Sequence, residues 1–531
     1  MSLTSVAVRP TEYTELNAIL SGYKLAQADQ ATLELSYSLP FTLSDSASFT
    51  GIAYESFKVS QLLEYPIFGL SKEQVQLFQE ALTSWESVAN LSFIEILETE
   101  RSVGEIRVTF ASQTGFDAVD KGGSTAFVAD LKAINYSSFG DIWVNESINS
   151  EASSSELFKF VMVHELGHIL GLEHSFEGAL QLPSNLDTTN QTVMSYTLAP
   201  YIWFEDRQQQ LIYPSSPSLL DVAAIQYLYG PNLTTASGDT RYTFDSNTPF
   251  YKTVWDADGF DTLDASEFTL PCDIDLRPGS FSSLRFDSPT FSTVNQDSQQ
   301  YDALYRGIDN LAIAYDCDIE AAYGGRNSDK LTGNTLNNLF YGNFGDDSID
   351  GGLGLDTARF DVLRTDARLE AIDGYMWRLT SPEGTDTLTS VERLMFDDRG
   401  IALDLDGAAG KVAKLLGAVF GEEATSNLFY VAAGLDYIDS LGTSELAYEA
   451  LAELALVAAN LSSHEAIVDV LYKNLTHAHP TAAEASPFIE WLDAQTLSPA
   501  QLAIYAAEHP LNIDNIDLAG LSATGLEYQI I

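Results

Sequence analysis

Three histidines and one glutamate lie close together in the stretch VMVHELGHILGLEH, in a chain that has only seven histidines. These four residues are His164, Glu165, His168 and His174. Residues four apart on a helix share a face and lie roughly 6 Å apart along its axis. His164 and His168 can therefore direct their imidazoles at one metal ion. Gly171 is expected to end the helix, which lets the chain turn back and bring His174 to the same ion.

This set of donors is typical of a catalytic zinc site. Three protein nitrogens leave one position of a tetrahedral zinc open, whereas a structural zinc is closed by a fourth protein ligand. A water in the open position has its pKa lowered toward neutrality and becomes a nucleophile. Glu165 can take the proton of that water and later return it to the leaving amine. A structural metal site is the alternative, but it needs a fourth ligand and leaves Glu165 without a role.

The elements around this stretch must hold it in place. A helix is predicted from about Ser153, where Ser153 and Glu156 have the spacing of a capping box, to Gly171. Before it, SKEQVQLFQEALTSWESVANLSF has helical spacing, and strands are predicted in ATLELSYSLPF, GEIRVTFAS, STAFVAD and GDIWVNES. After it, a loop-rich stretch leads to the amphipathic helix SLLDVAAIQYLYG. These elements form one α+β domain that ends near Pro231.

A second pattern begins at Gly324, where glycine recurs with a period of nine residues. The four units are GGRNSDKLT, GNTLNNLFY, GNFGDDSID and GGLGLDTAR. Their sixth positions are Asp329, Asn338, Asp347 and Asp356, and their eighth positions are Leu331, Phe340, Ile349 and Ala358. A glycine turn, an acidic or amide ligand and one inward apolar residue per unit are typical of a parallel β-roll that binds calcium. A loop rich in glycine and asparagine is the alternative, but four units in phase argue against it.

The composition limits the domain count and the classes of partner. A chain of 531 residues exceeds what one hydrophobic core usually supports, so two to four domains are expected. The 76 acidic and 26 basic residues give a net charge of -50, which repels nucleic acid and anionic lipid surfaces. The acid excess fits either a protein that collects divalent cations or one that stays soluble in salt. We expect no nucleic-acid partner, no stable membrane insertion and no N-terminal signal peptide.

The two cysteines have similar sequence settings. Cys272 lies in PCDIDL and Cys317 in DCDIEAA, which suggests neighbouring strands. A disulfide and two buried thiols are both open interpretations.

The stretch HELGHILGLEH, followed by TVMSY, resembles the metzincin zinc endopeptidases, in which a methionine turn lies beneath the metal. The resemblance implies that Met194 forms the floor of the site. It also implies that Tyr196 is the tyrosine that the serralysin branch adds near the zinc, where it ligates the resting metal and swings to stabilise the oxyanion. Further serralysin-like segments cover about Ser21 to Asp356, and they are SWESVANLSF, GDIWVNES, LLDVAAIQYLYG, TTASGDTRYTFDSNT, VWDADGFDTLDAS and IDLRPGSFSSL.

The resemblance implies a multidomain fold with an α+β metzincin catalytic domain, a parallel β-roll or β-sandwich domain and a C-terminal α-helical domain. The edge strand that borders the cleft is expected in STAFVAD. Helical periodicity in AYEALAELALVAANL and HEAIVDVLYKNL supports the last domain. The expected ranges are 1–20 for a short pro-segment, 21–235 for the protease domain, 236–405 for the calcium-binding domain and 406–531 for the helical domain, whose role is open.

The resemblance also implies calcium ligands. At the domain junction one ion would be held by Gly238, Thr240, Asp256, Asp258 and Asp261, and another by Gly259, Asp261, Asp318 and Glu320. In the repeats the candidates are Gly325, Asn327, Asp329, Gly345, Asp347, Gly354 and Asp356. The chain departs from the family at Ser175, where serralysins usually have proline, and at Asn327 and Asn338, which replace a repeat glycine and aspartate. Fewer or weaker calcium sites than in longer rolls are expected.

The sequence therefore predicts a secreted, calcium-dependent zinc metalloendopeptidase that hydrolyses peptide bonds of extracellular proteins. Its cofactors would be Zn²⁺ and Ca²⁺, and its catalytic residues Glu165 and Tyr196. The resemblance implies export by a type I secretion apparatus, and we expect a monomer. The alternative is a non-catalytic surface or binding protein in which the roll and helical domain carry the function. Every catalytic position is filled, which favours the enzyme. Cleavage preference and the way a pro-segment would block the site are not encoded in any pattern of the sequence.

Overall fold

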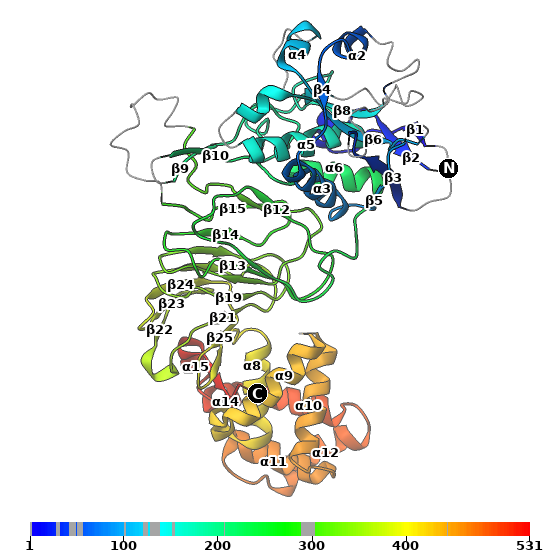
Figure 1. Ribbon diagram of the computed structural model, residues 1–531. Helices are drawn as coiled ribbons and strands as arrows, with labels where there is room; N and C mark the ends of the chain where they lie inside the picture. The colour runs from blue at the N-terminus through cyan, green and yellow to red at the C-terminus, as the bar shows by residue number, and fades with distance from the viewer. Residues whose placement is uncertain are drawn as a thin grey trace. The chain divides into compact units, whose positions relative to one another are not determined.

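The computed structural model of the chain describes residues 3–27, 32–41, 49, 57–99, 102–119, 126–127, 139–150, 154–205, 208–287, 303–442 and 444–530. The chain divides into two compact units, Met1–Ile319 and Glu320–Ile531 (Figure 1). The first unit contains an α/β region followed by short strands. The second begins with strands and continues with helices, so the multidomain architecture expected from the sequence is present.

A largely parallel sheet lies at the centre of the first unit. Its order is β5 (Leu91–Glu95), β3 (Leu33–Ser38), β6 (Ile106–Ala111), β8 (Gly140–Asn145) and β7 (Ala126–Phe127). The pairs β3–β5, β3–β6 and β6–β8 are parallel, whereas β7 runs antiparallel to β8, and β4 (Ile67–Phe68) runs antiparallel to β6. Every residue of β6 and β8 is buried, as expected for the centre of a parallel sheet. Of the segment STAFVAD, the described residues are those of β7, at the end of this order.

Helix α3 (Lys72–Glu86) confirms the predicted helical segment before the metal-binding stretch. It begins at Ser71, whose side chain accepts a hydrogen bond from the backbone N–H of Gln74, while the Gln74 side chain accepts one from the backbone N–H of Ser71. At its other end the fully buried Trp85 donates its indole N–H to the carbonyl of Val163 at 3.2 Å. This bond ties α3 to the helix that carries the histidines.

That helix is α5 (Ser154–Leu170). Its predicted first residue, Ser153, lies outside the described residues. The predicted end is confirmed, because Gly171 follows Leu170 with φ +113°. A Cβ at this position would lie 2.5 Å from the carbonyl oxygen of Tyr23, so glycine is required there both by the backbone conformation and by the close approach. The second predicted helix of this region is also present, as α6 (Leu219–Tyr229).

The N-terminal residues are built into the first unit. Strand β1 (Thr4–Ala7) pairs antiparallel with β2 (Tyr23–Ala26), and α1 (Thr14–Ile19) lies between them in the chain. The backbone N–H of Ser21 donates to the carbonyl of Gly171 at 2.9 Å, and the N–H of Glu173 donates to the carbonyl of Ile19 at 2.8 Å. These bonds reach the turn between the second and third histidines. The assignment of residues 1–20 as a pro-segment stays a prediction.

Short strands fill the rest of the first unit. They are β9 (Ile202–Glu205), β10 (Gln208–Leu211), β11 (Arg241–Thr243), β12 (Lys252–Val254), β13 (Thr262–Asp264), β14 (Asp273–Asp275), β15 (Phe281–Ser282) and β16 (Leu311–Ile313). The pairs β11–β13 and β12–β16 are parallel. Both cysteines of this part are buried thiols and form no disulfide with each other. Cys317 Sγ accepts a hydrogen bond from the backbone N–H of Asp256 at 3.3 Å, and Cys272 Sγ donates to the carbonyl of Leu270 at 3.5 Å.

In the second unit the nine-residue repeats form strands that alternate between two sheets. One sheet contains β17 (Ala321–Tyr323), β19 (Leu339–Tyr341), β21 (Thr357–Arg359), β25 (Arg393–Met395), β26 (Gly400–Ala402) and β27 (Leu526–Tyr528), and the other contains β18 (Lys330–Thr332), β20 (Ser348–Asp350), β24 (Thr385–Thr389), β23 (Met376–Thr380) and β22 (Arg368–Asp373). Strands that lie two nine-residue repeats apart in the chain pair in parallel. Leu331 is therefore paired with Ile349, and Phe340 with Ala358. All four of these side chains are buried, as the period predicted.

The helices of the second unit follow β26. They are α8 (Ala408–Phe420), α9 (Leu428–Leu441), α10 (Glu445–Ala458), α11 (His464–Thr476), α12 (Ala482–Asp493), α13 (Pro499–Ala507), α14 (Pro510–Asn515) and α15 (Leu518–Thr524). They share one apolar core, to which α8 contributes Val412 and Leu416. After α15 the chain returns to the strands, because β27 pairs antiparallel with β26. No helix in the described ranges has the length and apolar content that a membrane crossing needs.

Candidate metal centre

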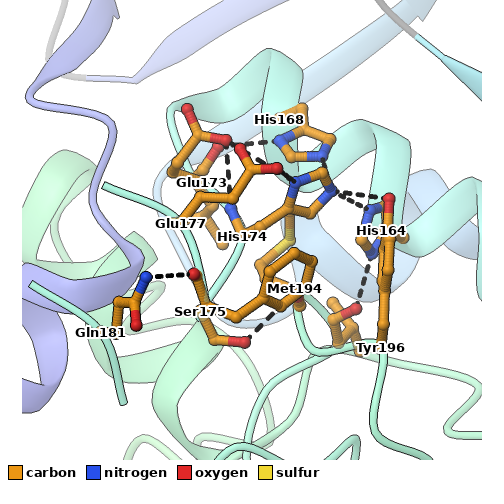
Figure 2. Close-up of polar contacts among 12 residues, drawn as sticks. His164, His168, Glu173, His174, Ser175, Glu177, Gln181, Met194 and Tyr196 are labelled. Atoms are coloured by element: carbon orange, nitrogen blue, oxygen red, sulfur yellow. Dashed lines mark hydrogen bonds and ion pairs between the residues drawn. The ribbon is translucent and has the colours of Figure 1, made fainter. Parts of the chain in front are cut away.

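The three histidines predicted as ligands meet at one point (Figure 2). His164 and His168 lie one turn apart on α5, and His174 lies in the loop that follows. The Nε2 atom of His174 is 3.3 Å from Nε2 of His164 and 3.1 Å from Nε2 of His168. Two nitrogen ligands of a tetrahedral zinc, each about 2.0–2.1 Å from the ion, lie about 3.4 Å apart. The spacing of these nitrogens therefore fits one zinc ion.

The opposite ring nitrogens of the two helical histidines face backbone carbonyls. Nδ1 of His164 lies 2.6 Å from the carbonyl oxygen of Val193, and Nδ1 of His168 lies 3.0 Å from that of Leu172. A carbonyl only accepts, so Nδ1 carries the proton and Nε2 keeps its lone pair for a metal. Burial lowers the pKa of His164 to about 4 and the pKa of His168 well below its usual range. Both imidazoles are thus neutral, which is the form that binds metals.

Met194, which the resemblance places beneath the metal, packs against the helix that carries two of the histidines. Its side chain is fully buried, and a Cβ added to Gly167 of α5 would lie 2.8 Å from the Met194 sulfur. The turn that contains it is anchored by Asp221 of α6. The Asp221 carboxylate accepts hydrogen bonds from the Thr192 hydroxyl at 2.6 Å and from the backbone N–H of Val193 at 2.7 Å. Because the Val193 carbonyl faces His164, this anchor reaches the first histidine.

Asp221 was missed by the sequence analysis. Its signal is the capping box at the start of α6, where its carboxylate also accepts a hydrogen bond from the backbone N–H of Ser218 at 2.9 Å. The residue is fully buried, and burial raises its pKa to about 6. The pattern showed a helix start, but the contacts with Thr192 and Val193 depend on the tertiary fold.

Replacing Asp221 by alanine is expected to lower the free energy of unfolding by about 3 kcal/mol or more. The variant leaves one hydroxyl and two backbone N–H groups without their acceptor, and each buried unsatisfied group costs about 1–3 kcal/mol. Denaturant unfolding of the metal-free protein measures the change. Asp221→Asn retains one acceptor oxygen and should lose less stability. Equal stability of all three proteins would contradict this role.

The predicted catalytic tyrosine lies beside the third histidine. The Tyr196 hydroxyl is 3.0 Å from Nε2 of His174, so it reaches the point where the histidine nitrogens meet. The residue is 66% exposed, which leaves its ring room to move.

Glu165 lies next to His164 on α5 and is buried. Its Oε2 atom has no hydrogen-bond partner among the described residues, and burial raises the pKa of its carboxyl group to about 8. A buried carboxylate without a partner is costly unless a cation or water compensates it. This orphaned oxygen therefore fits a cation at the three histidines.

Ser175, which stands where the family usually has proline, adds contacts that proline lacks. Its backbone N–H lies 3.4 Å from the carbonyl oxygen of Met194, and its hydroxyl donates to the Asp187 carboxylate at 2.6 Å. Proline has no N–H and no hydroxyl, so the substitution ties the loop of the third histidine to the methionine turn.

Four of the calcium candidates at the predicted junction come together in the first unit. The Asp261 carboxylate accepts a hydrogen bond from the backbone N–H of Thr240 at 2.8 Å, and the Thr240 hydroxyl donates to the carbonyl of Gly238 at 2.8 Å. A Cβ on Gly259, where φ is +143°, would lie 2.8 Å from the carbonyl carbon of Gly238.

The remaining calcium candidates at the predicted junction make fewer contacts with one another. Asp256 accepts hydrogen bonds from the Tyr242 hydroxyl at 2.6 Å and from the backbone N–H of Asp258 at 3.2 Å. Asp318 and Glu320 fall on opposite sides of the division between the two units. Their roles as ligands stay predictions.

The acidic residues of the repeats form two columns along the strands. In the first column the backbone N–H of Asp329 donates to the Asp347 carboxylate at 2.8 Å, and that of Asp347 donates to Asp386 at 2.9 Å. In the second column Asn338 donates in the same way to Asp356 at 2.7 Å, and Asp356 to Glu392 at 2.9 Å. Both acidic residues that end the columns were missed by the sequence analysis. Asp386 lies 39 residues beyond Asp347, which is not a multiple of nine, and Glu392 lies 36 residues beyond Asp356, past the last of the four repeats.

The repeat columns contain carboxylate oxygens that fit a cation. Oδ2 of Asp347 and Oδ2 of Asp356 are buried and have no hydrogen-bond partner among the described residues. Burial raises the pKa of both carboxyl groups to about 8, and that of Asp386 to about 7. Calcium prefers oxygen ligands of this kind.

At two of the candidate glycines in the repeats, the backbone conformation and a close backbone neighbour require glycine. Gly345 and Gly354 have φ of +138° and +134°, and a Cβ on either would lie within 2.7 Å of a backbone oxygen, that of Asn327 or that of Leu336. The backbone N–H of Gly325 donates to the Asp329 carboxylate. These positions bring carbonyl groups and carboxylates close to the turns, and their role as calcium ligands stays a prediction.

Comparisons with known proteins agree with this site. Residues 60–195 match the family described as Matrixin, and residues 147–246 match the family described as Met-zincin. The metalloprotease AprA of Pseudomonas entomophila is 33% identical over 326 residues, which cover 56% of this chain and 60% of that protein. Serralysin of Proteus mirabilis is 30% identical over 309 residues, which cover 52% of this chain and 56% of that protein.

The chain thus spans little more than half the length of these two relatives. A solved structure titled "Structure of myroilysin" covers 31% of this chain and 90% of its own, at 18% identity and a TM-score of 0.21, a value too low to bear on the fold. Both family matches include the stretch with the three histidines. This part of the chain is similar to the Matrixin and Met-zincin families and to serralysin, and its three histidines form a group that could hold a metal ion.

Proposed function

We propose that this protein is a secreted, calcium-dependent zinc metalloendopeptidase that hydrolyses peptide bonds of extracellular proteins. One observation carries the proposal. Three histidine nitrogens converge beside a buried glutamate that has an oxygen without a hydrogen-bond partner among the described residues. A structural metal site would use a fourth permanent protein ligand, whereas the fourth group here is the exposed Tyr196, which can leave.

His164, His168 and His174 would hold the zinc ion through their Nε2 atoms, with the Tyr196 hydroxyl as an exchangeable fourth ligand. When bound, zinc supplies Lewis-acid polarisation of the scissile carbonyl and lowers the pKa of a water molecule. Backbone carbonyls keep His164 and His168 in the ligand tautomer.

Glu165 would act as the general base and acid. Its carboxylate takes a proton from the attacking water and later delivers it to the nitrogen of the leaving amine. Burial alone raises its pKa to about 8, and positive charge near the three histidines favours its ionised form. A pKa near the working pH suits a group that must both accept and return a proton.

Tyr196 would stabilise the oxyanion of the tetrahedral intermediate. Its ring is exposed and its hydroxyl reaches the ligand nitrogen of His174, so a small rotation carries the O–H from the histidines to a substrate oxygen. A donor aimed at a developing negative charge lowers the barrier of acyl transfer.

Calcium would hold the repeats of the second unit. The carboxylates of Asp347 and Asp356 are buried and lack partners, and a cation bound between the strands would compensate them. A chain with a net charge of -50 is also expanded by self-repulsion where calcium is scarce. We therefore propose that the chain leaves the cell through a type I secretion apparatus and folds, as a monomer, where calcium is abundant.

The proposal is tested by zinc analysis and casein digestion with the same preparation. We expect one zinc ion per chain, loss of casein cleavage on treatment with a zinc chelator and recovery when zinc is restored. A zinc-loaded protein that cleaves neither casein nor any member of a random peptide library would overturn the proposal. That result would favour a non-catalytic binding protein instead.

A further inference from the structure

Two residues of the segment that follows the third histidine contact the ring of that histidine, and Figure 2 shows one of them, Glu177, beside it. The ring of Phe176 stacks on the ring of His174, with 5.1 Å between the centroids and 9° between the planes. The carboxylate oxygen Oε1 of Glu177 lies 3.3 Å from Nδ1 of His174. The two residues therefore contact the face and the far edge of the same imidazole.

His174 differs from the other two histidines in what surrounds its Nδ1 atom. Nδ1 of His164 and of His168 each face a backbone carbonyl, which fixes their protons. Nδ1 of His174 is buried and has no hydrogen bond of normal geometry within the described chain. The nearest carboxylate is that of Glu177, whereas that of Glu173 is farther away at 3.9 Å. A small rotation of the Glu177 side chain completes the missing hydrogen bond.

Phe176 is itself fixed in place. Its carbonyl oxygen accepts a hydrogen bond from the Gln181 side chain at 2.5 Å, which holds the loop. Its ring also packs against the ring of Tyr196, with 4.8 Å between the centroids. One aromatic side chain thus touches both the third histidine and the exchangeable tyrosine.

We propose that Phe176 and Glu177 are positioning residues that clamp His174 for metal binding. Glu177 accepts the Nδ1 proton and so keeps the Nε2 lone pair toward the metal, while Phe176 sets the plane of the ring. Groups that orient a metal ligand in this way raise metal affinity, and their loss typically costs about 10–100-fold. This inference rests on the proposed zinc function.

The clamp acts through direction rather than through charge. The Glu177 side chain is 54% exposed, so solvent screens its charge, and an exposed ion pair contributes little. A glutamine at this position keeps an acceptor oxygen and loses only the charge. It should therefore replace Glu177 with little effect, whereas alanine should not.

Zinc affinity of the full-length protein, measured by competition with a chromogenic chelator, tests the clamp without depending on activity. We expect Glu177→Ala and Phe176→Ala each to weaken zinc binding about 10-fold. Glu177→Gln and Phe176→Tyr, which keep the acceptor and the ring, should stay within about 3-fold of the parent protein. Leu180→Ala, in the same loop and 49% exposed, is the matched control and should change nothing. Thermal unfolding of the metal-free variants checks that each is folded.

The outcomes separate the clamp from the proposed function. If the parent protein binds no zinc, the proposed function fails and the clamp fails with it. If the parent binds zinc and both alanine variants bind it equally well, only the clamp is overturned. If Glu177→Gln loses as much affinity as Glu177→Ala, the role of Glu177 as a directional acceptor is wrong.

Discussion

Replacing Glu165 by glutamine is expected to lower kcat/KM for peptide hydrolysis about 1,000-fold, while the zinc content stays at one ion per chain. A general base and acid contributes about 10²–10⁴-fold to such reactions, and glutamine can neither take nor return the proton. The side chains have the same shape, so binding of substrate and metal should persist. Kinetics on a fluorogenic peptide, with zinc measured on the same sample, check both halves of the prediction.

The variant should also fold at least as well as the parent protein when metal is absent. Burial raises the pKa of Glu165 to about 8, which means that the charged form is disfavoured in this site. A neutral amide removes that penalty. Glu156→Gln is the matched control, because Glu156 lies exposed in the first turn of the same helix and should leave kcat/KM unchanged. If a zinc-loaded Glu165→Gln protein cleaves the peptide as fast as the parent protein, Glu165 is not the general base.

Removing calcium is expected to lower the melting temperature of the repeat strands in the second unit. Each site that is filled at 100 times its Kd adds about 2.7 kcal/mol to the stability of the folded state. Without the ion, Asp347 and Asp356 are buried carboxylates with an unpartnered oxygen, which destabilises the fold further. Circular dichroism in calcium and in a calcium chelator measures the difference.

The pH dependence of this effect has a defined sign. Burial raises the folded-state pKa of Asp347 and Asp356 from the usual 3.8 to about 8. Between these values the folded state binds more protons than the unfolded state, so the stability of the calcium-free protein falls as pH rises from about 4 to about 8. With calcium bound the carboxylates are ionised and compensated, and this slope should disappear. A melting temperature in chelator that stays level or rises across this window would contradict the assignment.

Asp347→Asn offers a matched control for both measurements. In chelator it should be more stable than the parent protein at pH 8, because it removes a charge that is costly to bury. In calcium it should be less stable, because it removes a ligand. If the stability of the variant changes in the same direction in chelator and in calcium, Asp347 contributes to packing and is not a calcium ligand.

The sequence by itself determined the parts of this protein that depend on local spacing. The interval of four between His164 and His168 placed both on one helical face, and Gly171 ended the helix as predicted. The period of nine identified the buried positions of the repeat strands, among them Phe340 and Ile349. These predictions succeed because helix and strand geometry fix which neighbours in the chain share a face.

Tertiary structure decided the contacts between segments that are distant in the chain. Asp221 anchors the methionine turn from 28 residues away, and Asp386 completes a repeat column from a position 39 residues beyond Asp347. Whether the cysteines pair was also decided by the fold, in favour of two thiols. Even the short contact of Glu177 with His174 depends on how the loop turns, which no period describes. Spacing in the sequence determines which residues share a helix or strand, whereas packing determines which helices and strands meet. The contacts that hold the metal centre in place depend on packing.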